Sequence, residues 1–170
     1  SIIKSFQMGF ADIAKKKEVD WSVTYNAYSV TKTFTALAVL QLHGKGIIDI
    51  NRSVSQYLPD FTYGTEITVK QLLNHSAGIP NPVPLGWIHS DSGHKIFDRD
   101  VFFEKIIEKN SKTKSEPNEK FAYSNLGYVI LGQLIEKVSG KKYEEYVTEN
   151  IIQRLPVNPG DLTFEVINDE

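Results

Sequence analysis

The chain of 170 residues contains no cysteine at all. A protein without cysteine has no disulfide bond, no thiolate nucleophile and no thiolate metal ligand, so these chemistries are excluded. No apolar run in it approaches the roughly 20 residues that a membrane-spanning helix needs. The formal net charge of −2 provides no excess of positive charge for binding nucleic acid or an anionic membrane surface.

What the chain does contain suits a single globular domain with a hydrophobic core. Its 170 residues are 41% hydrophobic, which is enough length and apolar surface for one packed unit. Alternating residues predict two strands, over 2–12 and 17–28, with a lysine-rich turn between them. We therefore expect one α+β domain over 1–170, divided along the chain into strands in 1–28, a mostly helical region in 29–156 and a tail in 157–170.

Local patterns predict where several helices begin and end. Apolar residues recur at helical spacing over 30–42, and Gly44 is expected to end that helix. The segment 76–97 is rich in glycine and proline, which predicts a long irregular loop. Further helix caps are predicted at Ser53, Thr68 and either Asp98 or Asp100.

A serine and a lysine stand three residues apart, Ser29 and Lys32, where the first apolar helix begins. Residues at positions i and i+3 lie on one face of a helix, so the hydroxyl and the amine can face the same pocket. Acylating serine enzymes of the S-x-x-K type use this arrangement, with the lysine in place of a histidine base. The structural alternative is that Lys32 packs its stem against the core and keeps its amine in water.

A tyrosine and an asparagine, Tyr123 and Asn125, precede a second apolar helix that is predicted over 126–138. Considered alone, Tyr123 would be a core tyrosine with a satisfied hydroxyl. Asn125 would be the N-cap of the helix that follows it. The pattern Tyr-x-Asn gains chemical meaning only together with the upstream serine and lysine.

Three histidines, His75, His89 and His94, lie near Asp91 and Asp98, which raises the alternative of a metal site. Their spacing places no two of them one helical turn apart, and the segment has no regular scaffold. We therefore expect no metal and no cofactor. A Ser-His-Asp triad is not expected either, because the nucleophile elbow G-x-S-x-G is absent from the sequence.

The serine–lysine pair and the Tyr-x-Asn motif together resemble two motifs of the serine β-lactamase and penicillin-binding protein superfamily. The likeness is greatest to the branch of class C β-lactamases, D-Ala-D-Ala carboxypeptidases and esterase-like proteins, and it covers roughly residues 9–156. The stretches that carry it are Ser29–Ala36, Gly46–Ile50, Tyr57–Pro59, Ile67–Pro80 and Tyr123–Tyr128. The resemblance implies a β-lactamase/transpeptidase-like fold, of which this chain holds mainly the helical region.

The resemblance also implies roles for four residues. Ser29 matches the acylated nucleophile, Lys32 the neighbouring base, and Tyr123 the residue that relays a proton between the nucleophile and the leaving group. Asn125 matches the amide that hydrogen-bonds the acyl side chain of the substrate, and His75 matches a hydrogen-bonded turn beside the cleft. The substrate would be a β-lactam, a D-amino-acid peptide or an ester, and the location periplasmic, extracellular or in the cell envelope.

One part of the superfamily pattern is absent. The third motif, Lys-Thr-Gly or His-x-Gly on an edge strand, occurs nowhere in the chain. We therefore expect most of the antiparallel sheet to be missing, and we expect this chain to show no turnover of a chromogenic β-lactam or ester. We also expect it to pair with a missing segment or to self-associate. The alternative to an enzyme is a non-catalytic binding or scaffold protein that retains the fold.

Overall fold

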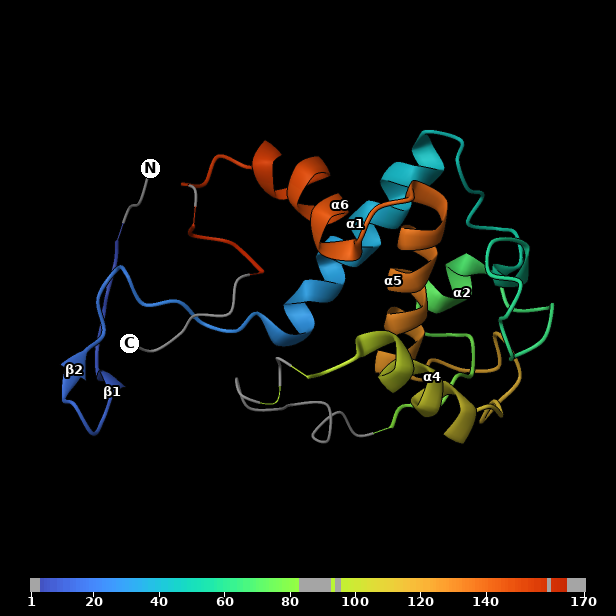
Figure 1. The fold of residues 1–170 in the computed structure, drawn as a ribbon, viewed down its shortest axis with the longest axis horizontal. Helices are drawn as coiled ribbons and strands as arrows, with labels where there is room; N and C mark the ends of the chain where they lie inside the picture. The colour runs from blue at the N-terminus through green and yellow to red at the C-terminus, as the bar shows by residue number, and fades with distance from the viewer. Residues whose placement is uncertain (1–3, 83–92, 94–95, 159, 165–170) are drawn as a thin grey trace.

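The computed structural model describes residues 4–82, 93, 96–158 and 160–164. Its helices pack around the central helix α5, while a short two-stranded ribbon lies apart from them (Figure 1). The main helices are α1 (Thr31–Gly44), α2 (Val69–Leu73), α4 (Arg99–Lys109), α5 (Asn125–Ser139) and α6 (Tyr143–Asn150). Single 3-10 turns occur at η1 (Tyr28–Val30), η2 (Val54–Gln56) and η4 (Ile152–Arg154).

The hydrophobic core lies where α5 meets α1, α2 and α6. Apolar residues of α5 recur every three or four positions, so they form one buried face of this helix. The fully buried large side chains of the core are Val39, Leu42, Val54, Ile67, Val69, Leu72, Leu126, Ile130, Leu131, Leu134, Ile135 and Val147. Because this face is buried, α5 is held firmly in the core. The candidate site is built on this helix.

The helix predicted over 30–42 extends slightly further than expected. Gly44 is its last residue, and the left-handed position falls at Gly46, which has a φ of +70°. The Ile47 N–H donates to the Leu42 carbonyl and the Gly46 N–H to the His43 carbonyl, which is the Schellman pattern. The prediction that Gly44 ends the helix as its C′ residue was therefore wrong by two positions.

The second predicted helix begins at Asn125, and its N-cap is Ser124 rather than Asn125. The Ser124 Oγ accepts a hydrogen bond from the Gly127 N–H at 3.0 Å and donates to the Pro80 carbonyl at 2.8 Å. At the other end, Gly140 closes the helix with a φ of +69°. Because Ser124 caps the helix, the Asn125 side chain is left available for other contacts.

The remaining caps follow the sequence closely. Thr68 and Gln71 form the predicted capping box, and Asp98 caps α4. Ser53 accepts a hydrogen bond from the Ser55 N–H, so it caps η2 by a different contact from the predicted one. Arg99, the first residue of α4, binds carboxylates of α5 and α6 and so ties the three helices together.

The two predicted strands are much shorter than expected. Within the described residues they are limited to β1 (Phe10–Asp12) and β2 (Lys17–Glu18), which pair antiparallel with an irregular register. Phe6 and Met8, which precede β1, are 79% and 80% exposed. A ribbon that has no further strand or helix against its apolar face is too weakly stabilised to extend, which explains the difference.

The predicted loop over 76–97 lies largely outside the described residues. Its first part, 76–82, is held against the segment 114–118 by backbone hydrogen bonds. The Lys114 N–H donates to the Gly78 carbonyl and the Asn118 N–H to the Ser76 carbonyl, each at 2.8 Å. The hydrogen bond from the Ser124 Oγ to the Pro80 carbonyl places this part of the loop beside the N-terminal end of α5. Among the described residues, no helix is long and apolar enough to cross a membrane.

Candidate active site

The candidate nucleophile lies at the N-terminal end of the first long helix. Ser29 is the middle residue of η1, which continues directly into α1 at Thr31. The residue before it, Tyr28, has a φ of +42°, which is uncommon for a residue other than glycine. Strained backbone of this kind occurs often at functional sites, where surrounding contacts hold it in place. The hydroxyl of Ser29 is exposed and therefore accessible to a substrate.

Four side chains predicted from the sequence converge on one point. The Ser29 Oγ lies 2.9 Å from the Tyr123 hydroxyl. The Lys32 Nζ donates to the Ser29 Oγ at 3.4 Å and to the Asn125 Oδ1 at 2.7 Å. The Tyr123 hydroxyl also approaches the Asn125 Oδ1 at 3.4 Å. The structure therefore brings Ser29, Lys32, Tyr123 and Asn125 together, from segments that are more than 90 residues apart in the chain.

The amide of Asn125 is held by a residue that the sequence analysis did not single out. The Asn81 Oδ1 accepts hydrogen bonds from the Asn125 backbone N–H at 2.9 Å and from its Nδ2 at 3.0 Å. This contact orients the Asn125 Oδ1 toward the Lys32 ammonium. Asn81 lies between two prolines in an irregular segment, and no local pattern in the sequence indicates a partner 44 residues away.

His75 lies beside the same site, as the resemblance implied. Its Nδ1 accepts a hydrogen bond from the Ser124 N–H at 3.2 Å. Its ring centroid lies 4.5 Å from that of Tyr123 and 5.0 Å from that of Tyr128. Burial, and secondarily the charge of Lys32, lowers the pKa of His75 below its ordinary value of 6.5. His75 is therefore a neutral acceptor near neutral pH.

Electrostatics favour the ionised form of Tyr123. Burial acts to raise the pKa of its phenol, but the interactions with Lys32 and Ser29 outweigh burial and lower the pKa below the ordinary value of 10.0. The Lys32 Nζ lies 4.9 Å from the centroid of the Tyr123 ring. A cation in this position stabilises a phenolate, so a larger fraction of Tyr123 is ionised here, and able to accept a proton, than of a free tyrosine at the same pH.

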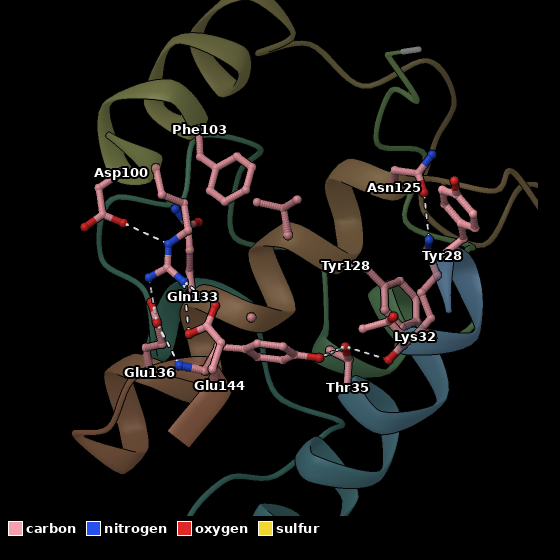
Figure 2. Close-up of a pocket in the computed structure, with 15 residues that line it drawn as sticks. Tyr28, Lys32, Thr35, Asp100, Phe103, Asn125, Tyr128, Gln133, Glu136 and Glu144 are labelled. Carbon is pink, nitrogen blue, oxygen red and sulfur yellow. Dashed lines mark hydrogen bonds and ion pairs between the residues drawn. The ribbon is translucent and has the colours of Figure 1, made fainter. Parts of the chain in front are cut away.

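A cavity of about 280 Å³ extends from the site into the helical body (Figure 2). Lys32 and Asn125 lie at one end of it. At the other end Arg99 binds Glu136 at 2.8 Å and Glu144 at 3.1 Å. Figure 2 shows α5 running from Asn125 at one polar end to Glu136 at the other, with Tyr128 along the way. The cavity can therefore receive a group that is polar at its ends and apolar between them.

The structure describes only some of the residues that raised the metal alternative. Among the described residues, no group of three or more histidine, aspartate or glutamate side chains could hold an ion. His89 and His94 lie outside the described residues. His75 uses its Nδ1 to bind the backbone of Ser124, so that atom is already engaged.

Comparison with known proteins identifies the family that the chain resembles. The model of the family described as Beta-lactamase matches residues 3–159. Penicillin-binding protein 4* of Bacillus subtilis is 32% identical over 151 residues, a match that covers 88% of this chain and 33% of that protein. The chain thus spans about a third of the length of the curated relatives it matches.

Two solved structures show a similar fold. The D-amino acid amidase of Ochrobactrum anthropi SV3, in complex with L-phenylalanine amide, has a TM-score of 0.72 and 26% identity, covering 85% of this chain and 39% of that one. The octameric penicillin-binding protein homologue of Pyrococcus abyssi has a TM-score of 0.68 and 31% identity, with coverage of 85% and 34%.

These matches confirm the expected β-lactamase/transpeptidase-like fold, represented by its helix-rich part with a single two-stranded ribbon among the described residues. The family model spans nearly the whole chain, including both motifs from which the site is built. The chain therefore belongs to the Beta-lactamase family, within the superfamily of serine β-lactamases and penicillin-binding proteins.

Proposed function

We propose that this chain carries the acylation machinery of a serine hydrolase, with Ser29 as the nucleophile. The observation that carries the proposal is the 2.9 Å contact between the Ser29 Oγ and a tyrosine hydroxyl whose pKa is lowered. A serine hydroxyl is a weak nucleophile unless an adjacent group takes its proton. Tyr123 lies at the distance that such a transfer requires.

The contacts favour Tyr123 as the immediate proton acceptor and Lys32 as the supporting cation. Lys32 donates to Asn125 at 2.7 Å and to Ser29 at the longer distance of 3.4 Å. In the proposed step, the Ser29 Oγ forms a bond to the substrate carbonyl carbon while its proton moves to the Tyr123 oxygen. The same proton then passes to the leaving group as its bond to the carbonyl carbon breaks. Water or an amine subsequently releases the acyl group from Ser29.

The backbone of the nucleophile supports the developing negative charge. The Ser29 N–H lies at the N-terminal end of the η1–α1 segment, where the helix dipole is positive. We propose it as one donor to the oxyanion. The loss of one such donor typically lowers the rate by about 10²- to 10³-fold. The absent third motif would normally supply the second donor.

The proposed substrates are carboxylic acid derivatives: a β-lactam, a D-amino-acid peptide or amide, or an ester. The structural likeness to a D-amino acid amidase supports the amide class. The Asn125 Oδ1 accepts a hydrogen bond from Lys32, and the Asn125 Nδ2 donates one to Asn81. We therefore propose two roles for Asn125. Its main role is to orient Lys32, and the accessible part of its amide contacts the acyl side chain of a substrate.

The second candidate is a non-catalytic binding or scaffold protein. The observation that favours it is the absence of Lys-Thr-Gly and His-x-Gly from the sequence. Against it stands the complete set of Ser29, Lys32, Tyr123 and Asn125 at hydrogen-bonding distances. A protein that only binds does not need a nucleophile beside a proton acceptor.

The experiment that separates these candidates is intact-mass measurement after exposure to a fluorophosphonate or a reactive penicillin. We expect a covalent adduct on Ser29 and none on the Ser29→Ala variant. Adduct on Ser29→Ala, or none on the wild-type chain and on a longer form that includes the third motif, would contradict the proposal. Adduct only on the longer form would show that the site residues are right and that this chain alone is insufficient.

We further propose that the chain contacts another polypeptide surface. Several large apolar side chains are exposed around η1 and α1, including Val30, Leu37 and Leu40. Exposed apolar groups gathered on one face favour association. The octameric homologue supports self-association as one form of that contact.

A further inference from the structure

His75 occupies an unusual backbone conformation directly after α2. Its φ is +60°, in the left-handed region that is uncommon for residues other than glycine, although asparagine, aspartate and histidine are enriched there. The backbone is held there from two sides. The His75 N–H donates to the Leu72 carbonyl at 3.3 Å, and the His75 carbonyl accepts from the Ala122 N–H at 2.8 Å. The turn is thus attached to the segment that carries Tyr123.

The side chain of His75 makes a second attachment to that segment. The Nδ1 accepts the Ser124 N–H at 3.2 Å. The ring packs on Tyr123 with an interplanar angle of 38°, on Tyr128 with 35°, and edge-on against Phe121. Every residue from Phe121 to Ser124 therefore contacts His75. This segment also ends at Asn125, whose contacts with Lys32 depend on the same backbone.

The acceptor at Nδ1 fixes the protonation state that the contact needs. A neutral imidazole accepts at one nitrogen and carries its proton on the other, so the proton of His75 belongs on Nε2. A protonated ring would place an N–H against the Ser124 N–H. The titratable groups that face the ring are Lys32 from α1, Tyr128 from α5 and Tyr123 from the segment before it.

We propose that neutral His75 is a positioning residue for Tyr123 and Asn125, which it holds through the Ser124 N–H and the stacked Tyr123 ring. Protonation of His75 would remove the acceptor and loosen the segment 121–125. The inference rests on the proposed function for its catalytic consequence. The link between His75 and Ser124 can be tested without any reaction.

The expected dependence on pH follows from the lowered pKa of His75. The folded chain binds fewer protons at this ring than the unfolded chain, so the contribution of His75 to stability is full above about pH 6.5. It is lost as the pH falls from there toward the lower folded-state pKa. The segment 121–125 is likewise expected to become less ordered as the pH falls over this range.

The first test uses nuclear magnetic resonance on the 170-residue chain. Long-range proton–nitrogen spectra of the histidine rings, assigned with His75→Asn, report which ring nitrogen carries the proton. We expect Nε2–H at pH 8, and a Ser124 amide signal that shifts with the same midpoint as the His75 ring, below about pH 6.5. A proton on Nδ1 at pH 8, or a Ser124 amide signal that does not shift as His75 titrates, would overturn the proposal.

The second test compares two replacements that both tolerate the φ of His75. Asparagine adopts this conformation and can place its Oδ1 where Nδ1 accepts the Ser124 N–H, whereas glycine adopts it with neither acceptor nor ring. The rate of labelling by a fluorophosphonate is measured across pH. We expect His75→Gly to react at least about tenfold more slowly than His75→Asn, as the loss of a positioning hydrogen bond predicts.

The pH profile separates positioning from simple packing. Besides the dependence on pH that Tyr123 causes, labelling of the wild type should show an additional loss at acid pH with the midpoint seen for the His75 ring, and His75→Asn should lack that additional loss. Equal rates for His75→Gly and His75→Asn, or an unchanged acid limb in His75→Asn, would overturn the proposal. If neither the wild-type chain nor the longer form that includes the third motif reacts, the proposed function fails, and the magnetic resonance test decides the role of His75 alone.

Discussion

The hydroxyl of Tyr123 contacts Ser29, the proposed nucleophile, and its ring stacks on His75, so the hydroxyl and the ring can be tested separately. Tyr123→Phe keeps the ring and removes only the hydroxyl. We expect the rate of Ser29 labelling to fall by about 10²- to 10⁴-fold, the range that general acid–base groups contribute. Because the phenolate is the active form, the wild-type rate should rise with pH toward a pKa below 10.0.

That rise should be absent from Tyr123→Phe, and the thermal unfolding midpoint should change little. A Tyr123→Phe variant that reacts as fast as the wild type would show that another group takes the proton of Ser29. The labelling rate constants, measured by mass spectrometry between pH 5 and about 10, provide both readouts.

Lys32 supplies the positive charge of the site, and its removal can be matched by a control on another helix. Lys32→Met keeps most of the side-chain volume but loses the ammonium that contacts Ser29 and Asn125. We expect labelling to collapse while the circular dichroism spectrum is retained. Lys70→Met, at an exposed position of α2, should label as the wild type does. If the Lys32→Met variant is labelled as fast as the wild type, the role of Lys32 is structural and not catalytic.

The convergence of Ser29 and Lys32 could be predicted from their spacing, whereas Tyr123 and Asn125 were expected beside them only through the resemblance to the superfamily. Ser29 and Lys32 are one helical turn apart, so local geometry alone places them together. The contact of Asn81 with Asn125 joins irregular segments 44 residues apart, and no periodicity encodes it. Sequence likewise placed His75 beside the cleft without indicating that its ring would accept the Ser124 N–H.

At the scale of elements, the turn at Gly78 determines where the segment with Asn81 lies. Gly78 has a φ of +71°, and a Cβ added there would overlap the carbonyl oxygen of Ser115. We expect Gly78→Ala to lower the free energy of unfolding by about 2 kcal/mol or more, because left-handed strain and steric overlap add. Urea denaturation measures the change.

The matched control is Gly64→Ala. Gly64 has a φ of +89°, and a Cβ added there meets no atom within 4 Å. Gly64→Ala should therefore lower the free energy of unfolding by the backbone strain alone, about 1–2 kcal/mol. Equal losses in the two variants would mean that the contact with Ser115 can relax without consequence.

Among the elements, the helices were predicted correctly, whereas the two strands were predicted to be much longer than the described residues show. The helices α1 and α5 bury residues at regular spacing, so periodicity locates them. Their exact ends depend on left-handed residues such as Gly46, which side-chain pattern alone does not fix. A strand needs a partner supplied by distant sequence. In the described residues, only the β1–β2 pairing supports the predicted hairpin.

At the scale of the whole molecule, the exposed apolar surface around α1 predicts association. Leu37 and Leu40 are 44% and 47% exposed, and Val30 is 61% exposed. We expect the chain to bind a hydrophobic dye and to elute larger than a monomer. The double variant Leu37→Glu with Leu40→Glu should reduce both effects while retaining helix content. A wild-type monomer that binds no dye would contradict this expectation.

The site is assembled from stretches around residues 29, 75–81 and 121–125, with Ser29 and Tyr123 separated by 94 residues. Contacts of such long range form only after large loops have closed, so they lag behind the local helices during folding. Ser29 in a partly folded chain is therefore an ordinary, unreactive alcohol. During refolding, Ser29 should become reactive toward a fluorophosphonate only when α5 docks against α1. The time at which labelling begins would therefore measure when this final docking step occurs.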